Sequence, residues 1–296
     1  MKLDNVLYVF SLGALVAAMP ATAAPFVFDN GNLDGRMASA SRPATAGKFE
    51  IESADDFILA NRTLINSASF TGLVPSGTGL GSFSDVRVEI YRVFPNDSNV
   101  GRTSGPPTFS TTQVPTRVNS PSDVALENRG AAGGGLSFTT TVLSGSFSAI
   151  NSVQPGGIHP RPNQTTGGDG PVSGQEVQFD ATFLTPLDLP ADHYFFVPQV
   201  ALNGSGNFLW LSSVRPIVPP GTPFTPDLQA WARDQFLDPD WLRIGTDIGG
   251  GSPPATFNLA FTLQGQTVPE SVPEPASLAL FAGAIGGLAL LRRRRD

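Results

Sequence analysis

Residues that could carry catalysis are few in this chain. The sequence has two histidines, His159 and His193, and no cysteine, which excludes thiol nucleophiles and thiolate metal sites. No serine lies in the G-x-S-x-G motif of a hydrolase nucleophile elbow. Glu176 and Asp180 share one face of an expected strand but lie about 13 Å apart, whereas glycoside hydrolysis uses two carboxyl groups at roughly 5–9.5 Å. We therefore expect a protein that is not an enzyme.

Aspartates next to turns indicate weak candidates for a calcium site. Ca²⁺ takes about six to eight oxygen ligands from carboxylates, carbonyls and water. Two groups of side chains could supply them, Asp55 with Asp56, and Asp238 with Asp240 and Asp247. Neither group has the residue order of an EF-hand loop, and the alternative is that these aspartates cap turns by accepting backbone N–H bonds. Ca²⁺ is the one cofactor that the sequence suggests.

The three tryptophans are the candidates for carbohydrate binding. Trp210, Trp231 and Trp241 could stack on sugar rings if their faces were exposed. The alternative is that they fill the core, where large aromatic rings contribute most burial, and this alternative is favoured because nothing in the sequence places the rings outward.

The body of the chain predicts an all-β fold. In the segment VRVEIYRVF, the apolar Val86, Val88 and Ile90 alternate with charged residues, as in a strand with one buried face. Segments of similar character are separated by Gly- and Pro-rich turns, and they are residues 49–59, 64–73, 136–143, 147–153, 176–184, 193–202, 208–213, 241–246 and 256–263. Residues 227–234, DLQAWARD, are expected to form a short helix. About ten strands favour a single antiparallel β-sandwich, and specifically a jelly roll, as the ectodomain over residues 24–268.

Two long loops rich in Gly, Pro and Ser interrupt this pattern, at about residues 95–135 and 154–174. The second has almost no large apolar side chains and cannot bury enough surface to order itself. We expect both loops to be structureless and mobile.

Residues 1–23 predict a signal peptide. Lys2 opens a short polar region, and residues 6–18 form an apolar stretch of the length of a signal-peptide core. Ala21 and Ala23 fit the small-x-small rule, so signal peptidase is expected to cut before Ala24. The alternative, an uncleaved anchor, would need a longer apolar run to span a membrane.

The C-terminus has the organisation of a short membrane segment. A Pro-Glu-Pro motif precedes an apolar run, and an arginine cluster follows that run: Val272, Pro273, Glu274 and Pro275, then residues 276–291, then Arg292, Arg293, Arg294 and Arg295. As a helix the run would span roughly 24 Å, slightly short of a ~30 Å hydrocarbon core. Arginines resist translocation, so the residues before 276 are expected outside the inner membrane.

These three parts resemble the PEP-CTERM sorting signal of exported proteins from Gram-negative bacteria that make exopolysaccharide. The resemblance covers about the last 25 residues and implies a linker at 269–275, a transmembrane helix at 276–291 and a basic cytoplasmic tail at 292–296. It also implies processing near the Pro-Glu-Pro motif by exosortase, a membrane-embedded transpeptidase, and then release or transfer to the cell surface. The alternative is a plain membrane anchor in which Pro273 and Pro275 only break the helix.

The charge of the chain limits its partners. The net charge is −7, and residues 276–296 remove four arginines against one aspartate, so the body is more acidic than the whole. An acidic body argues against binding to nucleic acid or to anionic lipid. Divalent cations and neutral polymers such as polysaccharide are more compatible.

These observations lead to three hypotheses of function. The leading one is a non-enzymatic structural or adhesive protein, anchored in the inner membrane during sorting and then associated with exopolysaccharide at the cell surface or in the extracellular matrix. The second is a carbohydrate- or calcium-binding jelly-roll module. The third, with the least support, is a secreted hydrolase.

Overall fold

The computed structural model of this chain describes residues 23–45, 47–102, 114, 116–158, 165–215 and 227–269. Internal contacts separate Ala24–Val268 from a second unit made of Met1–Ala23 and Pro269–Asp296. Apart from Ala23 and Pro269, that second unit lies outside the described residues. The predicted signal peptide, sorting motif, transmembrane helix and basic tail all fall there. In the ranges that the structure describes, none of the helices has the length and apolar character needed to span a bilayer.

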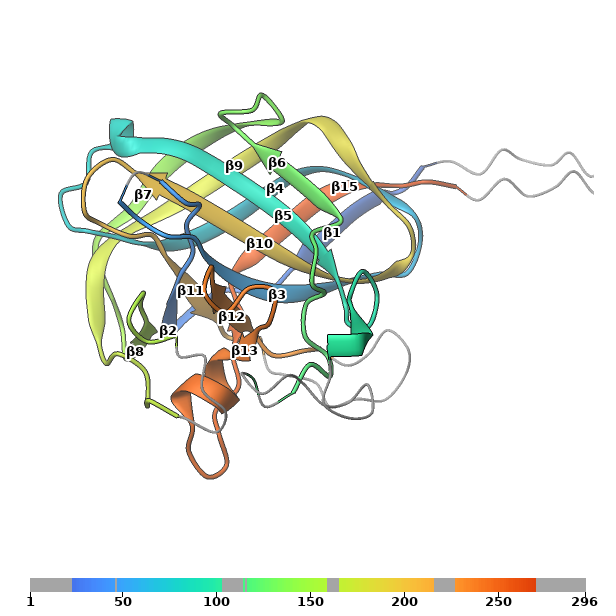
Figure 1. The fold of residues 1–296 in the computed structure, drawn as a ribbon. Helices are drawn as coiled ribbons and strands as arrows, with labels where there is room; N and C mark the ends of the chain where they lie inside the picture. The colour runs from blue at the N-terminus through green and yellow to red at the C-terminus, as the bar shows by residue number, and fades with distance from the viewer. Residues whose placement is uncertain are drawn as a thin grey trace, which may run out of the picture. The chain divides into compact units, whose positions relative to one another are not determined.

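The unit Ala24–Val268 is built almost entirely of strands (Figure 1). They are β1 (Pro25–Asp29), β2 (Leu33–Ala40), β3 (Ile51–Leu59), β4 (Thr63–Val74), β5 (Phe83–Arg92), β6 (Glu127–Gly130), β7 (Leu136–Ala149), β8 (Asn151–Val153), β9 (Val172–Leu189), β10 (Asp192–Leu202), β11 (Leu209–Ser213), β12 (Trp231–Asp234), β13 (Leu242–Arg243), β14 (Asn258–Leu259) and β15 (Phe261–Thr267). Three short helical turns accompany them, η1 (Leu80–Ser82), η2 (Val100–Arg102) and η3 (Ile244–Gly249).

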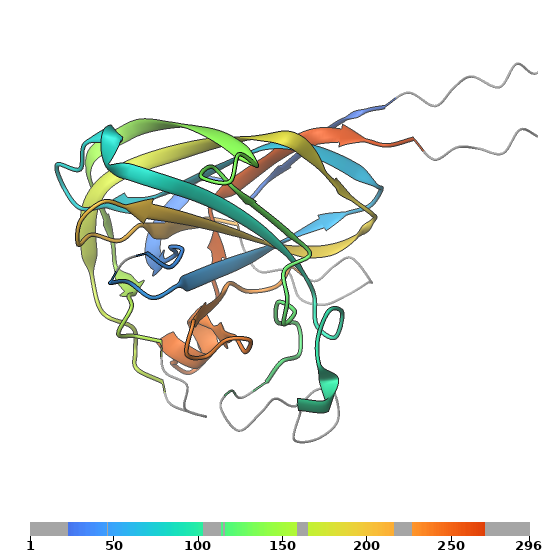
Figure 2. The ribbon, with the colours of Figure 1, turned by 45° about the horizontal axis from the view of Figure 1, so that its top comes forward.

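The strands form two sheets, which confirms the prediction of an all-β fold with two layers. In the nine-stranded sheet, β4 pairs with β15 and β9, which gives the order β1-β15-β4-β9-β7. The first and last strands, β1 (blue) and β15 (red-orange), therefore lie side by side in Figure 2. In the same sheet β11 joins β4, β14 and β2, and β2 joins β8. The six-stranded sheet has the order β13-β12-β3-β10-β5-β6. All pairings are antiparallel except that of β2 with β8.

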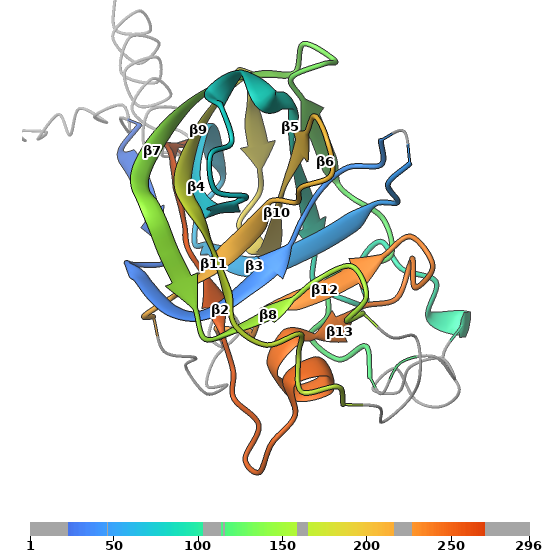
Figure 3. The same cartoon turned by 90° about the vertical axis from the view of Figure 1, so that its left-hand side faces the viewer.

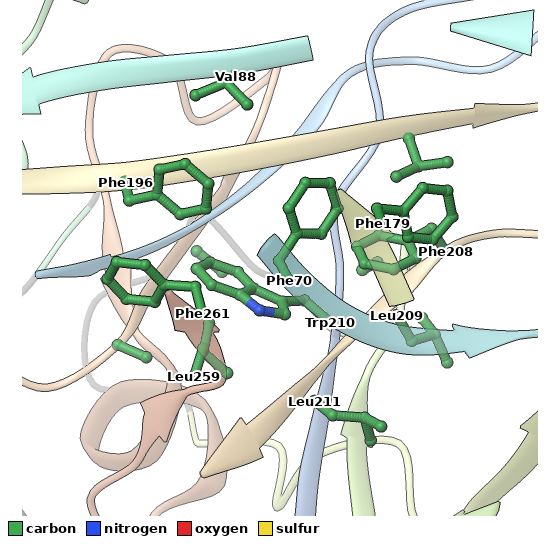
Figure 4. Packing of buried hydrophobic residues seen from close by; sticks show 14 of the residues in the cluster. Phe70, Val88, Phe179, Phe196, Phe208, Leu209, Trp210, Leu211, Leu259 and Phe261 are labelled. Carbon is green, nitrogen blue, oxygen red and sulfur yellow. The ribbon is translucent and has the colours of Figure 1, made fainter. Parts of the chain in front are cut away.

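Figure 3 shows strands of both sheets, among them β4 and β9 of the nine-stranded sheet and β3, β10 and β5 of the six-stranded one. The hydrophobic core is formed by side chains from both sheets. Alternate residues of each strand point into it, as the period of two along a strand requires. Phe70 of β4 stacks on Phe179 of β9 with ring centroids 5.3 Å apart, and Phe196 of β10 stacks on Phe261 of β15 at 4.8 Å. Trp210 lies beside these rings (Figure 4) and donates its Nε1–H to the carbonyl of Ala260 at 2.8 Å.

The central strand β10 is buried on both faces. Tyr194 and Phe196 belong to the core between the sheets, whereas Phe195 and Val197 belong to a second apolar cluster on the outside of the six-stranded sheet. Burial on both sides explains the continuous apolar run YFFV in this strand.

The prediction of a helix at residues 227–234 is wrong. Trp231–Asp234 form β12, which pairs with β3 from Trp231 opposite Ala54 to Asp234 opposite Ile51. Pairing along β3 supplies hydrogen bonds to this segment, and burial of its side chains on both faces outweighs its modest helix propensity.

The strand predicted at 241–246 is also shorter than expected. It covers Leu242–Arg243 and gives way to η3. The reason lies in Asp247, whose carboxylate accepts hydrogen bonds from the backbone N–H of Arg243 at 2.8 Å and from its guanidinium at 2.6 and 2.9 Å. These contacts fold the chain back instead of extending it.

The sequence predicted two structureless loops at about residues 95–135 and 154–174, but both contain residues of strands. The second loop does so only at its end, where β9 begins at Val172. Residues Glu127–Gly130 form β6 and pair with β5, and Arg117 is buried with its guanidinium 4.4 Å from the ring centroid of Phe94. These contacts with β5 and Phe94 offset the low apolar content of the first loop. The sequence did not predict β1 and β2 either, since the first strand that it predicted begins at residue 49.

Candidate ligand-binding groove

The outer face of the nine-stranded sheet carries a groove with a volume of about 450 Å³. Its floor consists of polar side chains of β4, β9 and β15, which alternate along these strands with residues buried in the core. The floor residues are Ser69, Thr71, Glu176, Gln178 and Thr262. The volume falls within the range of ~300–1,000 Å³ typical of small-ligand sites. Because the floor is made of paired strands, these side chains have a rigid support.

Two segments form the walls of the groove. On one side, the register of β7 against β9 shifts before and after Ser144, and this irregular stretch places Leu143 and Phe147 at the groove. On the other side, the last residue of β1, Asp29, and the turn after it, with Gly31, form the wall. The N–H of Gly31 donates to Asp29 Oδ1 at 2.8 Å, and its φ of +83° is the left-handed conformation that glycine adopts without strain.

The electrostatics of the groove favour a ligand without negative charge. Asp29 and Glu176 are its ionisable side chains, and no lysine or arginine of the described residues lines it. Burial raises the pKa of Glu176. The remaining polar groups are hydroxyls and amides, which exchange hydrogen bonds readily with a neutral, hydroxyl-rich molecule. An anionic polymer would meet like charge here.

Asp180 lies beside the floor and orients two of its side chains. Its Oδ1 accepts a hydrogen bond from Ser69 Oγ at 2.6 Å and another from Gln178 Nε2 at 2.8 Å. The amide of Gln178 is thereby fixed, and its carbonyl oxygen is left to accept from a ligand. Glu176 and Asp180 thus share the outer face of β9, but Asp180 serves as an internal acceptor.

The outer face of the six-stranded sheet is covered by chain, in contrast to the groove. Arg233 of β12 donates to the carboxylate of Glu52 on β3 and lies 4.2 Å from the ring centroid of Trp241. The hydroxyl of Tyr91 lies 2.7 Å from Glu52 Oε1 and 2.8 Å from Glu89 Oε2. This group of ionisable side chains, Glu52, Glu89, Tyr91 and Arg233, is termed the covered ionic cluster.

The two carboxyl groups of the covered ionic cluster have pKa values shifted in opposite directions. Burial, together with the negative charge of Glu52, raises the pKa of Glu89 to about 8. Burial acts most strongly and would raise the pKa of Glu52, but the charge and hydrogen bond of Arg233, together with hydrogen bonds from Tyr91 and Glu89, outweigh it and lower this pKa. Opposed carboxyl pairs occur at acid–base sites. Here, however, Glu52 is 4 % and Glu89 is 5 % exposed, so neither is open to a substrate. Through Arg233, Glu52 instead holds residues 227–243 on the sheet, a stretch termed the covering segment because its Leu228, Trp231 and Trp241 pack on the outer face.

All three tryptophans suggested as sugar-binding residues lie in the interior. Trp210 belongs to the core, and Trp231 and Trp241 to the cluster outside the six-stranded sheet. None is more than 1 % exposed, so an exposed ring face, the condition for stacking on a sugar, is not met in this structure. Phe147, which the sequence did not single out, is half-buried at the groove, whereas the other two phenylalanines that line it, Phe70 and Phe261, are buried in the core.

The suggested calcium ligands are dispersed over the structure. Asp238 lies against Arg233 at 2.8 Å, Asp240 against Arg102 at 3.0 Å, and Asp247 binds Arg243. Asp56 Oδ2 lies 2.6 Å from His193 Nε2, and Asp56 Oδ1 accepts from the backbone N–H of Leu228 at 2.9 Å. Asp55 is wholly buried and points toward the nine-stranded sheet, where it accepts from the N–H of Leu259 at 2.7 Å. Among the described residues, no group of three or more His, Asp or Glu side chains is arranged to hold a metal ion.

The residues of the termini contribute little to this geometry. Ala24 precedes β1 and exchanges hydrogen bonds with Thr267, whose N–H donates to its carbonyl at 2.9 Å. Ala23 is exposed at the edge of the described residues, and Ala21 lies outside them, as do all residues of the sorting motif. Signal-peptide cleavage therefore stays a prediction.

Comparison with protein families identifies the C-terminal segment. A family model, the PEP-CTERM protein-sorting motif, matches residues 271–295. This chain carries a PEP-CTERM sorting signal. The match confirms the resemblance noted in the sequence, and the signal implies an exported protein that is sorted by exosortase. Comparison of this chain with curated proteins and with solved structures finds no match.

Proposed function

We propose that this PEP-CTERM protein is a non-enzymatic structural or adhesive component of the cell surface or extracellular matrix, and that its β-sandwich associates with exopolysaccharide by binding a neutral glycan segment in the groove. The sorting signal supports delivery to the outside of the cell. A signal peptidase cut before Ala24 and a transient inner-membrane anchor at 276–291 complete the proposed route.

The observation that carries the binding proposal is the groove itself. It joins hydroxyl and amide groups, the half-buried ring of Phe147 and two carboxylates on a rigid sheet, and no basic side chain of the described residues lines it. A neutral sugar chain offers many hydroxyls that can donate to Glu176 and Asp29 and accept from hydroxyl groups. Phe147 offers an apolar surface for the face of a sugar ring.

We further propose that the sandwich is a jelly roll. Its two sheets contain the strand orders β1-β15-β4-β9 and β3-β10-β5-β6. In both, strands far apart in the sequence lie next to one another, as they do when a long hairpin of strands is rolled into two antiparallel sheets.

Glycan-array binding of the purified protein, followed by calorimetry with the best neutral oligosaccharide, tests the proposed binding. Gln178→Ala is expected to weaken the affinity about tenfold, because it removes one amide hydrogen-bonding group from the floor. Asn66→Ala is the matched control, since Asn66 is exposed on β4 and does not line the groove. Equal affinities in both variants, or preference for anionic over neutral glycans, would contradict the proposal.

The same experiment separates binding from hydrolysis. Glu176 and Asp29 are two carboxylates in one groove, and the raised pKa of Glu176 would suit a general acid. A non-enzymatic protein leaves the bound oligosaccharide intact over long incubation. If the oligosaccharide is cleaved and Glu176→Gln abolishes cleavage while retaining binding, the protein is a hydrolase instead.

A further inference from the structure

Four buried oxygen atoms without a hydrogen-bond partner occur in neighbouring residues at one place between the sheets. They are Asp55 Oδ1, Ser213 Oγ, Asp227 Oδ1 and Asn258 Oδ1, here termed the unpaired oxygens. Each parent residue is at most 6 % exposed. Buried polar atoms in folded proteins nearly always have a partner, so four such atoms in one place need an explanation.

Hydrogen bonds and strand pairing bring the four residues together. The Nδ2 of Asn258 donates to Asp227 Oδ2 at 3.2 Å, and Ser213 is the partner of Asn258 in the pairing of β11 with β14. Asp55 accepts from the backbone N–H of Leu259, the residue that follows Asn258. The site thus joins β3 of one sheet to β11 and β14 of the other, with Asp227 at the start of the covering segment.

Three of these side chains are anchored through one atom and have the other atom unpaired. Asp55 Oδ2 accepts from Asn30 Nδ2 at 2.6 Å and from the N–H of Leu259 at 2.7 Å. Asp227 Oδ2 lies 2.9 Å from Nε of Arg215, and the Nδ2 of Asn258 is used in its bond to Asp227. Metal ligands have this arrangement, since contacts to the second atom of a ligand group fix its orientation.

The charge at this place is not balanced by protein groups. Arg215 pairs with Asp227 and also donates to Asn30 Oδ1 at 2.6 Å. Asp55 has no ion pair with any described residue, although it is fully buried. A buried carboxylate without a counter-charge is costly, and a proton or a cation can neutralise it, whereas ordered water would leave the charge in place. A proton on Asp55 would leave the other three oxygens without a partner, whereas a cation can contact all four.

We propose that the unpaired oxygens form a site for one hard divalent cation of the Ca²⁺ class. Two carboxylates, one amide carbonyl and one hydroxyl offer the oxygen ligands that Ca²⁺ prefers, and water completes its coordination. The bound cation ties the two sheets together where the covering segment begins.

The four residues come from separate parts of the chain, which explains why spacing in the sequence does not reveal the site. Asp55 alone among them was a candidate from the sequence. The proposed site has two carboxylates, one amide and one hydroxyl. It is therefore distinct from a cluster of three or more acidic or histidine side chains, and no such cluster occurs in the described residues.

Calorimetry tests this site. The full-length protein in detergent is first stripped of metals with a chelator and is then titrated with CaCl₂. One Ca²⁺ per chain is expected to bind, with Mg²⁺ at least tenfold weaker because it demands a tighter octahedral shell. At a hundredfold excess of Ca²⁺ over Kd, the midpoint of thermal unfolding is expected to rise by about 5 °C.

Two variants assign the binding to the unpaired oxygens. Asp227→Asn removes one ligand charge with little change in shape and is expected to weaken Ca²⁺ binding at least tenfold. Ser213→Ala is a milder change and is expected to weaken Ca²⁺ binding several-fold. If the Asp227→Asn protein does not fold, as shown by the lack of a cooperative unfolding transition, the affinity of Ser213→Ala tests the site instead. Asp188→Asn, an exposed acid that pairs with Arg62, is the control and should bind Ca²⁺ unchanged.

Two results would overturn the proposal. One is a wild-type protein that unfolds cooperatively and binds no Ca²⁺. The other is Ca²⁺ binding of equal strength in the wild type, in Ser213→Ala and in any folded Asp227→Asn protein, because the ion would then sit elsewhere. Neither outcome bears on glycan binding in the groove, which uses other residues.

Discussion

The outer faces of the two sheets differ: that of the nine-stranded sheet carries an open groove, and that of the six-stranded sheet is covered by chain. On the nine-stranded sheet, the side chains opposite the core are hydroxyls, amides and carboxylates that line an open groove. On the six-stranded sheet, the corresponding positions hold Ala54, Tyr91, Phe195 and Val197, which are buried under chain from the loops together with Trp231 and Trp241.

We infer that the covered face contributes to the stability of the fold and that the open face is suited to binding a ligand. The covered face uses its charges internally, as Arg233 and Glu52 illustrate, and offers a ligand little surface. The open face has hydrogen-bonding groups that neighbouring side chains orient but do not fully use, as with Gln178. We therefore expect substitutions on the covered face to change the free energy of unfolding, and substitutions in the groove to change binding alone.

The largest effect is expected for Arg233→Met. The methionine would leave Glu52 as a buried carboxylate without its counter-charge, and breaking such a pair costs about 3–5 kcal/mol. Urea unfolding of the full-length protein, monitored by tryptophan fluorescence, measures this loss because Trp241 lies against Arg233.

A control for Arg233→Met comes from the partly exposed ion pair of Arg129 and Glu127 in β6. Arg129→Met should lower the free energy of unfolding by less than about 1 kcal/mol, since solvent screens this pair. If both variants lose the same small amount, the covered ionic cluster does not hold the covering segment in place.

A second, smaller effect on the covered face is a dependence of stability on pH. The pKa of Glu89 is about 8 in the folded protein, against its ordinary value of 4.5. The folded state therefore holds more protons than the unfolded state between these values. The contribution of Glu89 to the free energy of unfolding is therefore largest below pH 4.5. It falls as the pH rises from 4.5 to 8 and is constant above pH 8.

Glu89→Gln tests this dependence, because glutamine resembles the protonated acid and does not titrate. Urea unfolding at several pH values should give a flatter profile between pH 5 and 8 for Glu89→Gln than for the wild type. Glu127→Gln, in the strand next to Glu89, should retain the wild-type slope. A wild-type slope in Glu89→Gln would show that another group causes the titration.

The comparison of the two faces also explains how far the sequence predicts this structure. The strands predicted at 193–202 and 256–263 coincide with β10 and with β14 and the start of β15, because patterns of this kind depend only on local periodicity. The segment DLQAWARD was misassigned, since its conformation is determined by pairing with β3 and not by its own propensity.

The groove and the unpaired oxygens could not be predicted in this way. Thr71, Glu176 and Thr262 meet only because β4 pairs with both β9 and β15 in particular registers. The bulge that brings Leu143 and Phe147 to the groove has no sequence signal that would place it there. The sorting signal at 271–295, by contrast, depends on contiguous residues and was evident from the sequence.

The smallest effect on stability, and the sharpest test of the open face, is expected for Thr71→Arg. Thr71 points outward from β4 into the groove, so an arginine there can extend into solvent and should change the free energy of unfolding by no more than about 0.5 kcal/mol. The same side chain would occupy the floor of the groove and pair with Glu176 or Asp29, and the affinity for neutral oligosaccharide should fall more than tenfold. Gln264→Arg places the same charge on the exposed face of β15, outside the lining, and should leave affinity unchanged. If both arginine variants bind as the wild type does, the ligand does not use the groove, and the open face is exposed without being a binding surface.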